Sequence, residues 1–159
     1  MQPIFCFYLF AVCPAFLIAS ITDIKRHEIP LWDFPALFVL YIVFFHKELS
    51  YLNWSTLGIM AAAFFFLAVF GKIGGGDIIM FSVIGFIIGL YGIISYLIIL
   101  FCISCVVFMT VPFIWKKKNG AEWKGPVKGH EFPIAPMAGA SFGIWLVLRE
   151  TVPEIMRMV

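Results

Sequence analysis

One apolar stretch, residues 78–115, restricts the possible folds of this chain more than any other feature, because only Tyr91-Gly92 interrupts it. A helix needs about 20 residues to cross the hydrocarbon core of a bilayer, so the stretch is long enough for two crossings. The chain of 159 residues is 63% hydrophobic and only 13% charged, a composition that water-soluble domains do not have. We therefore predict an all-α, polytopic membrane protein.

Apolar segments separated by short polar linkers make up most of the remaining chain. They cover about residues 3–22, 31–45, 54–70 and 133–148. We expect each of them to form one membrane helix. Together with two crossings in the long apolar stretch, joined by a turn near Gly92, they predict six transmembrane helices in a single integral-membrane domain, residues 1–159.

The basic residues set the expected orientation, because Lys and Arg collect in cytoplasmic loops. If Lys25 and Arg26 are inside, two crossings between Lys72 and Lys116 keep most of the other basic residues inside as well. Eight basic residues are then inside (25, 26, 72, 116, 117, 118, 124, 128) and three are outside (47, 149, 157). The sequence therefore predicts that both termini lie outside and that residues 116–131 form a cytoplasmic loop.

Two lone aspartates mark the ends of predicted membrane helices. Asp23 follows the first apolar segment, and Asp77 follows the run Gly74-Gly75-Gly76. A carboxylate costs about 2.5–3.5 kcal/mol at the centre of a bilayer, so an ionisable residue in a membrane segment is a candidate site. The predicted topology puts both aspartates on the cytoplasmic face. The glycines allow a sharp backbone turn and the close approach of another chain.

Two carboxylates that face each other share a proton, because both cannot ionise at short range. The ionised member can then activate water while the protonated member polarises a peptide carbonyl, which is the chemistry of an aspartyl protease. This chemistry needs no metal and no cofactor, and nothing like a ligand set flanks Asp77. Asp33, in the first turn of the second helix, is expected to support the site, because the helix dipole stabilises an anion there.

Three motifs in order resemble one family, the type 4 prepilin peptidases. Residues 22–30, TDIKRHEIP, are similar to the family segment in which an Asp precedes a basic stretch and an Ile-Pro pair. Residues 74–77 match its G-x-G-D element, and residues 132–136, FPIAP, resemble the proline-containing start of its last helix. The resemblance covers about residues 5–150.

The resemblance implies a membrane aspartyl endopeptidase that removes the short basic leader from prepilins or pseudopilins at the cytoplasmic face of the inner membrane. It implies that Asp23 and Asp77 are catalytic and that Ile29 and Pro30 support them. The three glycines would serve the approach of a substrate backbone or of the first helix. The expected partners are the prepilin substrate and the lipid bilayer, and no nucleic acid. We also expect a short form that lacks the family's methyltransferase region.

Other functions remain open on the sequence. A noncatalytic assembly subunit could keep the same fold. A transporter could use the aspartates as ion ligands, although it would favour acidic residues near the middle of the membrane and an internal helix repeat. A presenilin-like protease would carry a Tyr-Asp pair, whereas this chain has Thr22-Asp23. Finally, the aspartates could simply mark the water boundary of their helices.

Overall fold

The computed structural model describes residues 3–26, 29–70, 74–119 and 134–151, and every secondary-structure element in these ranges is a helix. Three helices are long and apolar enough to cross a membrane: Pro3–Lys25, Tyr51–Val69 and Gly75–Thr110. A shorter apolar helix covers Asp33–Phe45. The all-helical fold is thereby confirmed, with three helices that could cross a membrane, whereas the count of six crossings stays a prediction.

The first membrane helix is a single rod built from three consecutive elements. They are α1 (Pro3–Phe7), the π-helical turn η1 (Tyr8–Val12) and α2 (Cys13–Arg26). The backbone stays helical at both junctions, with φ −62° and ψ −44° at Phe7 and φ −62° and ψ −45° at Cys13. The rod continues past the expected end at residue 22, so that Asp23 belongs to its last turn.

The other helices begin and end close to the predicted positions. They are α3 (Asp33–Phe45), α4 (Tyr51–Val69), α5 (Gly75–Asn119) and α6 (Ile134–Thr151). Before α4, the Asn53 side chain accepts a hydrogen bond from the Ser50 backbone N–H at 3.1 Å, which helps to fix the start of that helix.

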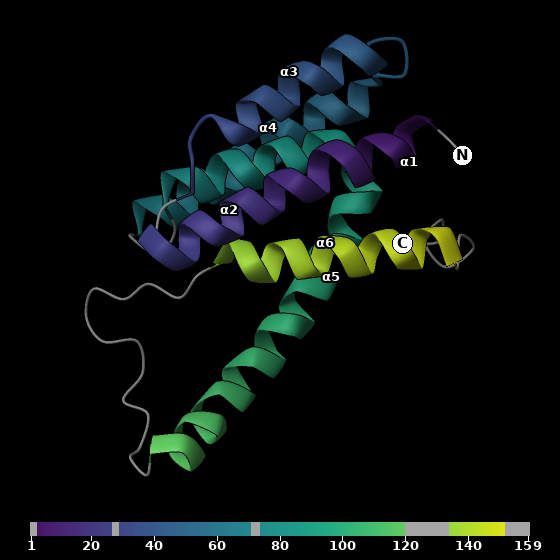
Figure 1. The fold of residues 1–159 in the computed structure, drawn as a ribbon. Helices are drawn as coiled ribbons and strands as arrows, with labels where there is room; N and C mark the ends of the chain where they lie inside the picture. Colours follow the sequence, from purple (N-terminus) through teal and green to yellow (C-terminus); the bar gives the residue numbers. More distant parts are fainter. Residues whose placement is uncertain (1–2, 27–28, 71–73, 120–133, 152–159) are drawn as a thin grey trace.

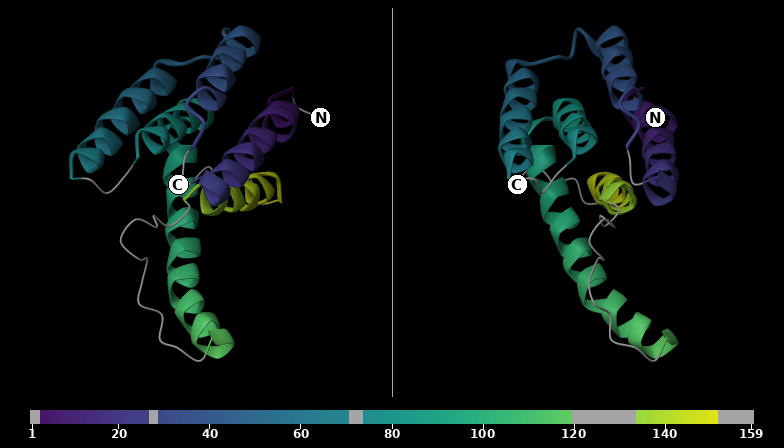
Figure 2. Two further views of the ribbon diagram at one scale, coloured as in Figure 1. Left: turned by 60° about the vertical axis from the view of Figure 1, so that its left-hand side comes forward. Right: turned by 90° about the vertical axis from the view of Figure 1, so that its left-hand side faces the viewer.

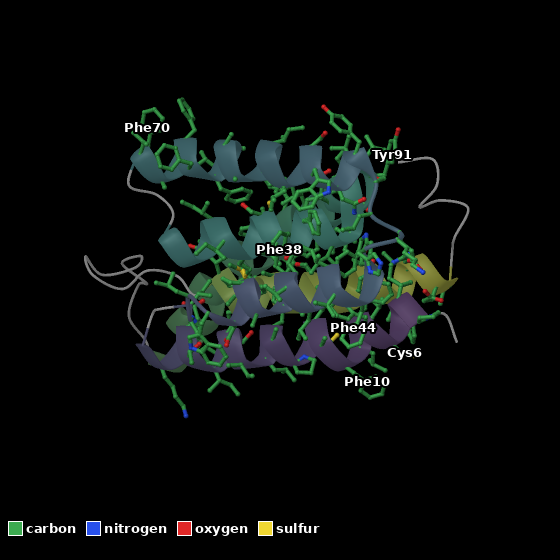
Figure 3. The ribbon with its side chains drawn as sticks, turned by 90° about the horizontal axis from the view of Figure 1, so that it is seen from above. Cys6, Phe10, Phe38, Phe44, Phe70 and Tyr91 are labelled. Carbon is green, nitrogen blue, oxygen red and sulfur yellow. The ribbon has the colours of Figure 1, made fainter. Side chains whose placement is uncertain are left out.

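Most of the helices run alongside one another, but the second half of α5 leaves the bundle steeply (Figures 1 and 2). The ends of α2 and α4 lie at the same end of the bundle as the beginnings of α3, α5 and α6 (Figure 1). We call this the aspartate end. Phe70, which follows α4, marks it in the view from above, and Tyr91 lies at the opposite end (Figure 3).

The change of direction in α5 occurs at Gly89, which has φ 73° and ψ 176°. This is the only left-handed φ among the described residues, and residues other than glycine rarely adopt this combination of angles. Without the bend, the 36 residues of Gly75–Thr110 would form a rod about 54 Å long, well beyond the roughly 30 Å of a bilayer core. The sequence predicted a turn near Gly92, and the bend lies one helical turn earlier.

Side chains from two other helices hold the last carbonyl groups before the bend. The Asn53 amide of α4 donates to the Phe86 carbonyl at 2.7 Å, and the Tyr8 hydroxyl of η1 donates to the Ile87 carbonyl at 3.5 Å. Carbonyl groups at a helix end need such partners because the helix itself no longer supplies them. The bend is thus fixed by tertiary contacts on both sides of α5.

We expect Gly89→Ala to destabilise the folded protein by about 1–3 kcal/mol, because an alanine at this φ and ψ is strained. Thermal unfolding of the protein purified in detergent would measure the loss. Gly143→Ala is the matched control, because Gly143 lies inside α6 with no left-handed φ and no atom within 4 Å of an added Cβ. Equal stability of the two variants would mean that the backbone of Gly89 is unstrained in the folded protein.

Candidate active site

Three carboxylates are buried at the aspartate end of the bundle. Asp23 is 7% exposed in the last turn of α2, Asp33 is 6% exposed at the start of α3, and Asp77 is 9% exposed in the first turn of α5. Their helices meet at this end although Asp77 comes 54 residues (77 − 23) after Asp23 in the sequence (Figure 1). They are the only buried acidic residues in the described part of the chain.

Asp23 is held by the last helix. The backbone N–H of Ala135, in the first turn of α6, donates to Asp23 Oδ2 at 2.9 Å. The first N–H groups of a helix have no partner within it and carry the positive end of the helix dipole, so they favour a nearby anion. The sequence suggested a helix start at this position from the prolines around Ala135, but it gave no sign that its N–H would bind a side chain.

Asp77 is held by the turn that precedes its own helix. Its Oδ2 accepts a hydrogen bond from the Gly74 N–H at 3.1 Å, and its backbone N–H donates to the Gly74 carbonyl at 3.2 Å. Asp77 therefore fixes the start of α5 in addition to presenting a carboxylate there. The two candidate catalytic side chains are anchored by separate backbone N–H groups.

The glycine run makes its closest contact through Gly76. A Cβ atom added to Gly76 would lie 2.9 Å from Ile29 Cβ and 3.1 Å from the Ile29 carbonyl oxygen. The linker between α2 and α3 therefore makes the close approach here, in the place where we expected the first helix or a substrate. None of the three glycines has a left-handed φ, and an added Cβ at Gly75 would meet no atom within 4 Å.

Asp33 lies on the face of α3 that packs into the bundle. The residues one, two and three turns further on the same face are buried as well: Leu37, Tyr41 and Phe45. Oxygen Oδ2 of Asp33 is buried and has no hydrogen-bond partner in the described part of the chain. Pro30, half-buried, precedes this helix at the same end of the bundle.

The arrangement supplies two anchored carboxylates on different helices, as acid–base chemistry requires. Within the described residues, the three aspartates do not form a group that could hold one metal ion. His27, Glu28, Lys72 and residues 120–131 of the basic loop, which sequence analysis assigned to the cytoplasmic side, lie outside the described residues.

Comparison with known proteins gives one match. The model of the type IV leader peptidase family matches residues 10–113. The matched region contains both candidate catalytic aspartates, the Ile29-Pro30 pair and the glycine run, and it ends before α6. No curated protein and no solved structure matches the chain.

Proposed function

Because the chain belongs to the type IV leader peptidase family, we propose that it is a membrane aspartyl endopeptidase with Asp23 and Asp77 as its catalytic pair. Membership confirms the family that the motifs in the sequence resemble, and the family implies a protease that works on leader-bearing substrates in a membrane. The proposed reaction removes the short basic leader from type 4 prepilins or pseudopilins at the cytoplasmic face of the inner membrane.

The observation that supports this proposal best is the burial of Asp23 and Asp77 at one end of the bundle, each with a backbone N–H on its carboxylate. In the proposed reaction the scissile peptide lies between α2 and α5. One carboxylate takes a proton from the attacking water, and the other gives a proton to the carbonyl oxygen. The open space next to Gly75 leaves room for an extended substrate backbone.

Co-expression with a prepilin-type protein tests the proposal directly. The substrate should have a short basic leader, then Gly, and a Glu five residues into an apolar helix. We expect a shorter product whose new N-terminus begins after that Gly, as N-terminal sequencing would show. An uncleaved substrate beside a membrane-inserted, folded enzyme would favour a noncatalytic role for the chain.

The orientation gives a separate prediction. In a variant without the four native cysteines, a cysteine at position 25 should be shielded from a membrane-impermeant thiol reagent in intact cells, because Lys25 lies in the basic last turn of α2, which is assigned to the cytoplasm. A cysteine at position 48, in the linker between α3 and α4, should react. Lys25 and Glu48 are both exposed, so burial within the protein does not account for the difference. Labelling at position 25 from outside would invert the proposed topology.

A further inference from the structure

Asp33 is a buried carboxylate that the proposed catalytic reaction leaves without a role. Its side chain is 6% exposed, and Oδ2 has no hydrogen-bond partner in the described ranges. Burying a charge without a partner is costly, whereas an apolar residue would continue the buried face of Leu37 and Tyr41 at no such cost. A hydrogen-bond donor placed at Oδ2 would offset this cost, and a positively charged donor would offset most of it.

Ring contacts along α3 place Asp33 beside the start of α5. The Phe86 ring of α5 lies 4.8 Å from the ring of Phe38 and 5.9 Å from that of Tyr41. The two helices run in the same direction from the aspartate end (Figure 1). Eight residues before Phe86 is Ile78, the neighbour of Asp77, and eight residues before Phe38 and Tyr41 are Pro30 and Asp33. The segment from Pro30 to Asp33 is therefore expected to lie level with the start of α5. The close approach of Ile29 to Gly76 also brings the linker before α3 next to the start of α5.

The described basic side chains do not fill this position. Lys25 is exposed, Lys47 follows the end of α3, and Arg149 lies in the last turn of α6; the last two are at the opposite end of the bundle. A basic side chain from outside the protein suits Asp33 best, because an ammonium or guanidinium group combines the missing charge with N–H donors. The proposed substrate carries such groups in its leader, before the Gly that precedes the bond to be cleaved.

Resting on the proposed function, we infer that Asp33 binds a basic side chain of the leader and so selects the substrate. It is a specificity residue and takes no part in the chemistry at Asp23 and Asp77. An extended peptide advances about 3.3–3.6 Å per residue. A basic side chain a few residues before the scissile bond can therefore reach Asp33 while the bond itself lies at the catalytic pair. Recognition of the leader then takes place within the bundle, beside the catalytic pair.

Peptide binding to the full chain in detergent tests this inference. The probes are a leader peptide with Lys or Arg and a peptide of the same sequence with Gln at those positions. Asp33→Asn should weaken binding of the basic peptide by about 30-fold and leave the Gln peptide unchanged, because removing one partner of a buried charge pair costs that much affinity. Glu48→Gln, which removes an exposed carboxylate at the other end of α3, is the control and should change neither.

A stability measurement separates leader binding from an internal salt bridge. If Asp33 awaits the leader, Asp33→Asn without peptide should unfold at the same temperature as the native protein or above it, because an uncompensated buried charge is removed. If Asp33 instead pairs with a basic residue of its own chain, the variant should unfold at a lower temperature and bind both peptides as the native protein does. That pair of results would overturn the inference.

Cleavage assays keep the two proposals apart. Suppose that the native protein cleaves neither peptide but binds the basic peptide more tightly than the Gln peptide, and that Asp33→Asn loses this difference in affinity. The peptidase proposal then fails, and leader binding by Asp33 stands. If the native protein cleaves the basic peptide, and Asp33→Asn keeps the same ratio of KM values for the two peptides, the peptidase proposal stands and the role of Asp33 is refuted.

Discussion

Asp23→Asn and Asp77→Asn should each lower the rate of leader removal by about 10²–10⁴-fold while the protein stays folded in the membrane. A pair with one titratable member cannot supply the base and the acid together. Asparagine is the appropriate replacement because its side-chain oxygen can still accept the hydrogen bond from Ala135 to residue 23 or from Gly74 to residue 77. The ratio of processed to unprocessed prepilin after co-expression measures the effect.

Glu150→Gln is a suitable control for these variants, because it removes an exposed carboxylate near the end of α6, away from the aspartate end. Membrane abundance and thermal unfolding of each variant should equal those of the native protein. A single aspartate variant that processes substrate at close to the native rate would remove that residue from the catalytic pair.

Gly76→Val should reduce activity far more than it reduces abundance in the membrane. Even the Cβ atom of Gly76→Ala would lie 2.9 Å from Ile29 Cβ, a distance that real Cβ atoms essentially never show, so Ile29 and its linker must move. Because Asp77 follows directly, that movement displaces the carboxylate, and a misplacement of about 1 Å can cost about 100-fold in rate. Processing per unit of inserted protein, measured with the same co-expressed prepilin, gives the effect.

A double variant shows whether Ile29 is the cause. Ile29→Gly removes the Cβ atom that the new side chain meets, so combining it with Gly76→Ala should recover part of the lost activity. Gly58→Ala is the control, because Gly58 lies within α4 with no atom within 4 Å of an added Cβ. Equal losses of activity and abundance in Gly76→Val would assign Gly76 to packing alone.

The helices could be located from the sequence because short polar linkers separate the apolar stretches. Apolar stretches between polar linkers predicted α3 within two residues of its observed start and α4 within three. The position of the bend in α5 could not be predicted in this way, because three glycines compete for it. An added Cβ at Gly85 would meet Met60 at 2.9 Å, and one at Gly92 would meet Trp145 at 3.2 Å, so these two serve packing and Gly89 alone bends.

The candidate site was visible in the sequence only through its side chains. Asp23 and Asp77 stood out because carboxylates are costly in apolar segments, and Asp33 because it begins a helix. The N–H of Ala135 and the carbonyl of Ile29 are backbone groups, and every residue except proline has both, so the residue type does not reveal them. The burial of Asp33 depends on which face of α3 packs inward, and the ring contacts with α5 decide this.

The hydrogen bond between Ala135 and Asp23 joins residues that leave the ribosome far apart in time. After Asp77 has been added, the ribosome must add 58 more residues (135 − 77) to reach Ala135. At about 5–20 residues per second this takes about 3–12 s. Throughout this interval a nascent chain carries all three aspartates but not the amide that holds the first. The proposed site thus gains the amide that holds Asp23 only when its last helix has been synthesised.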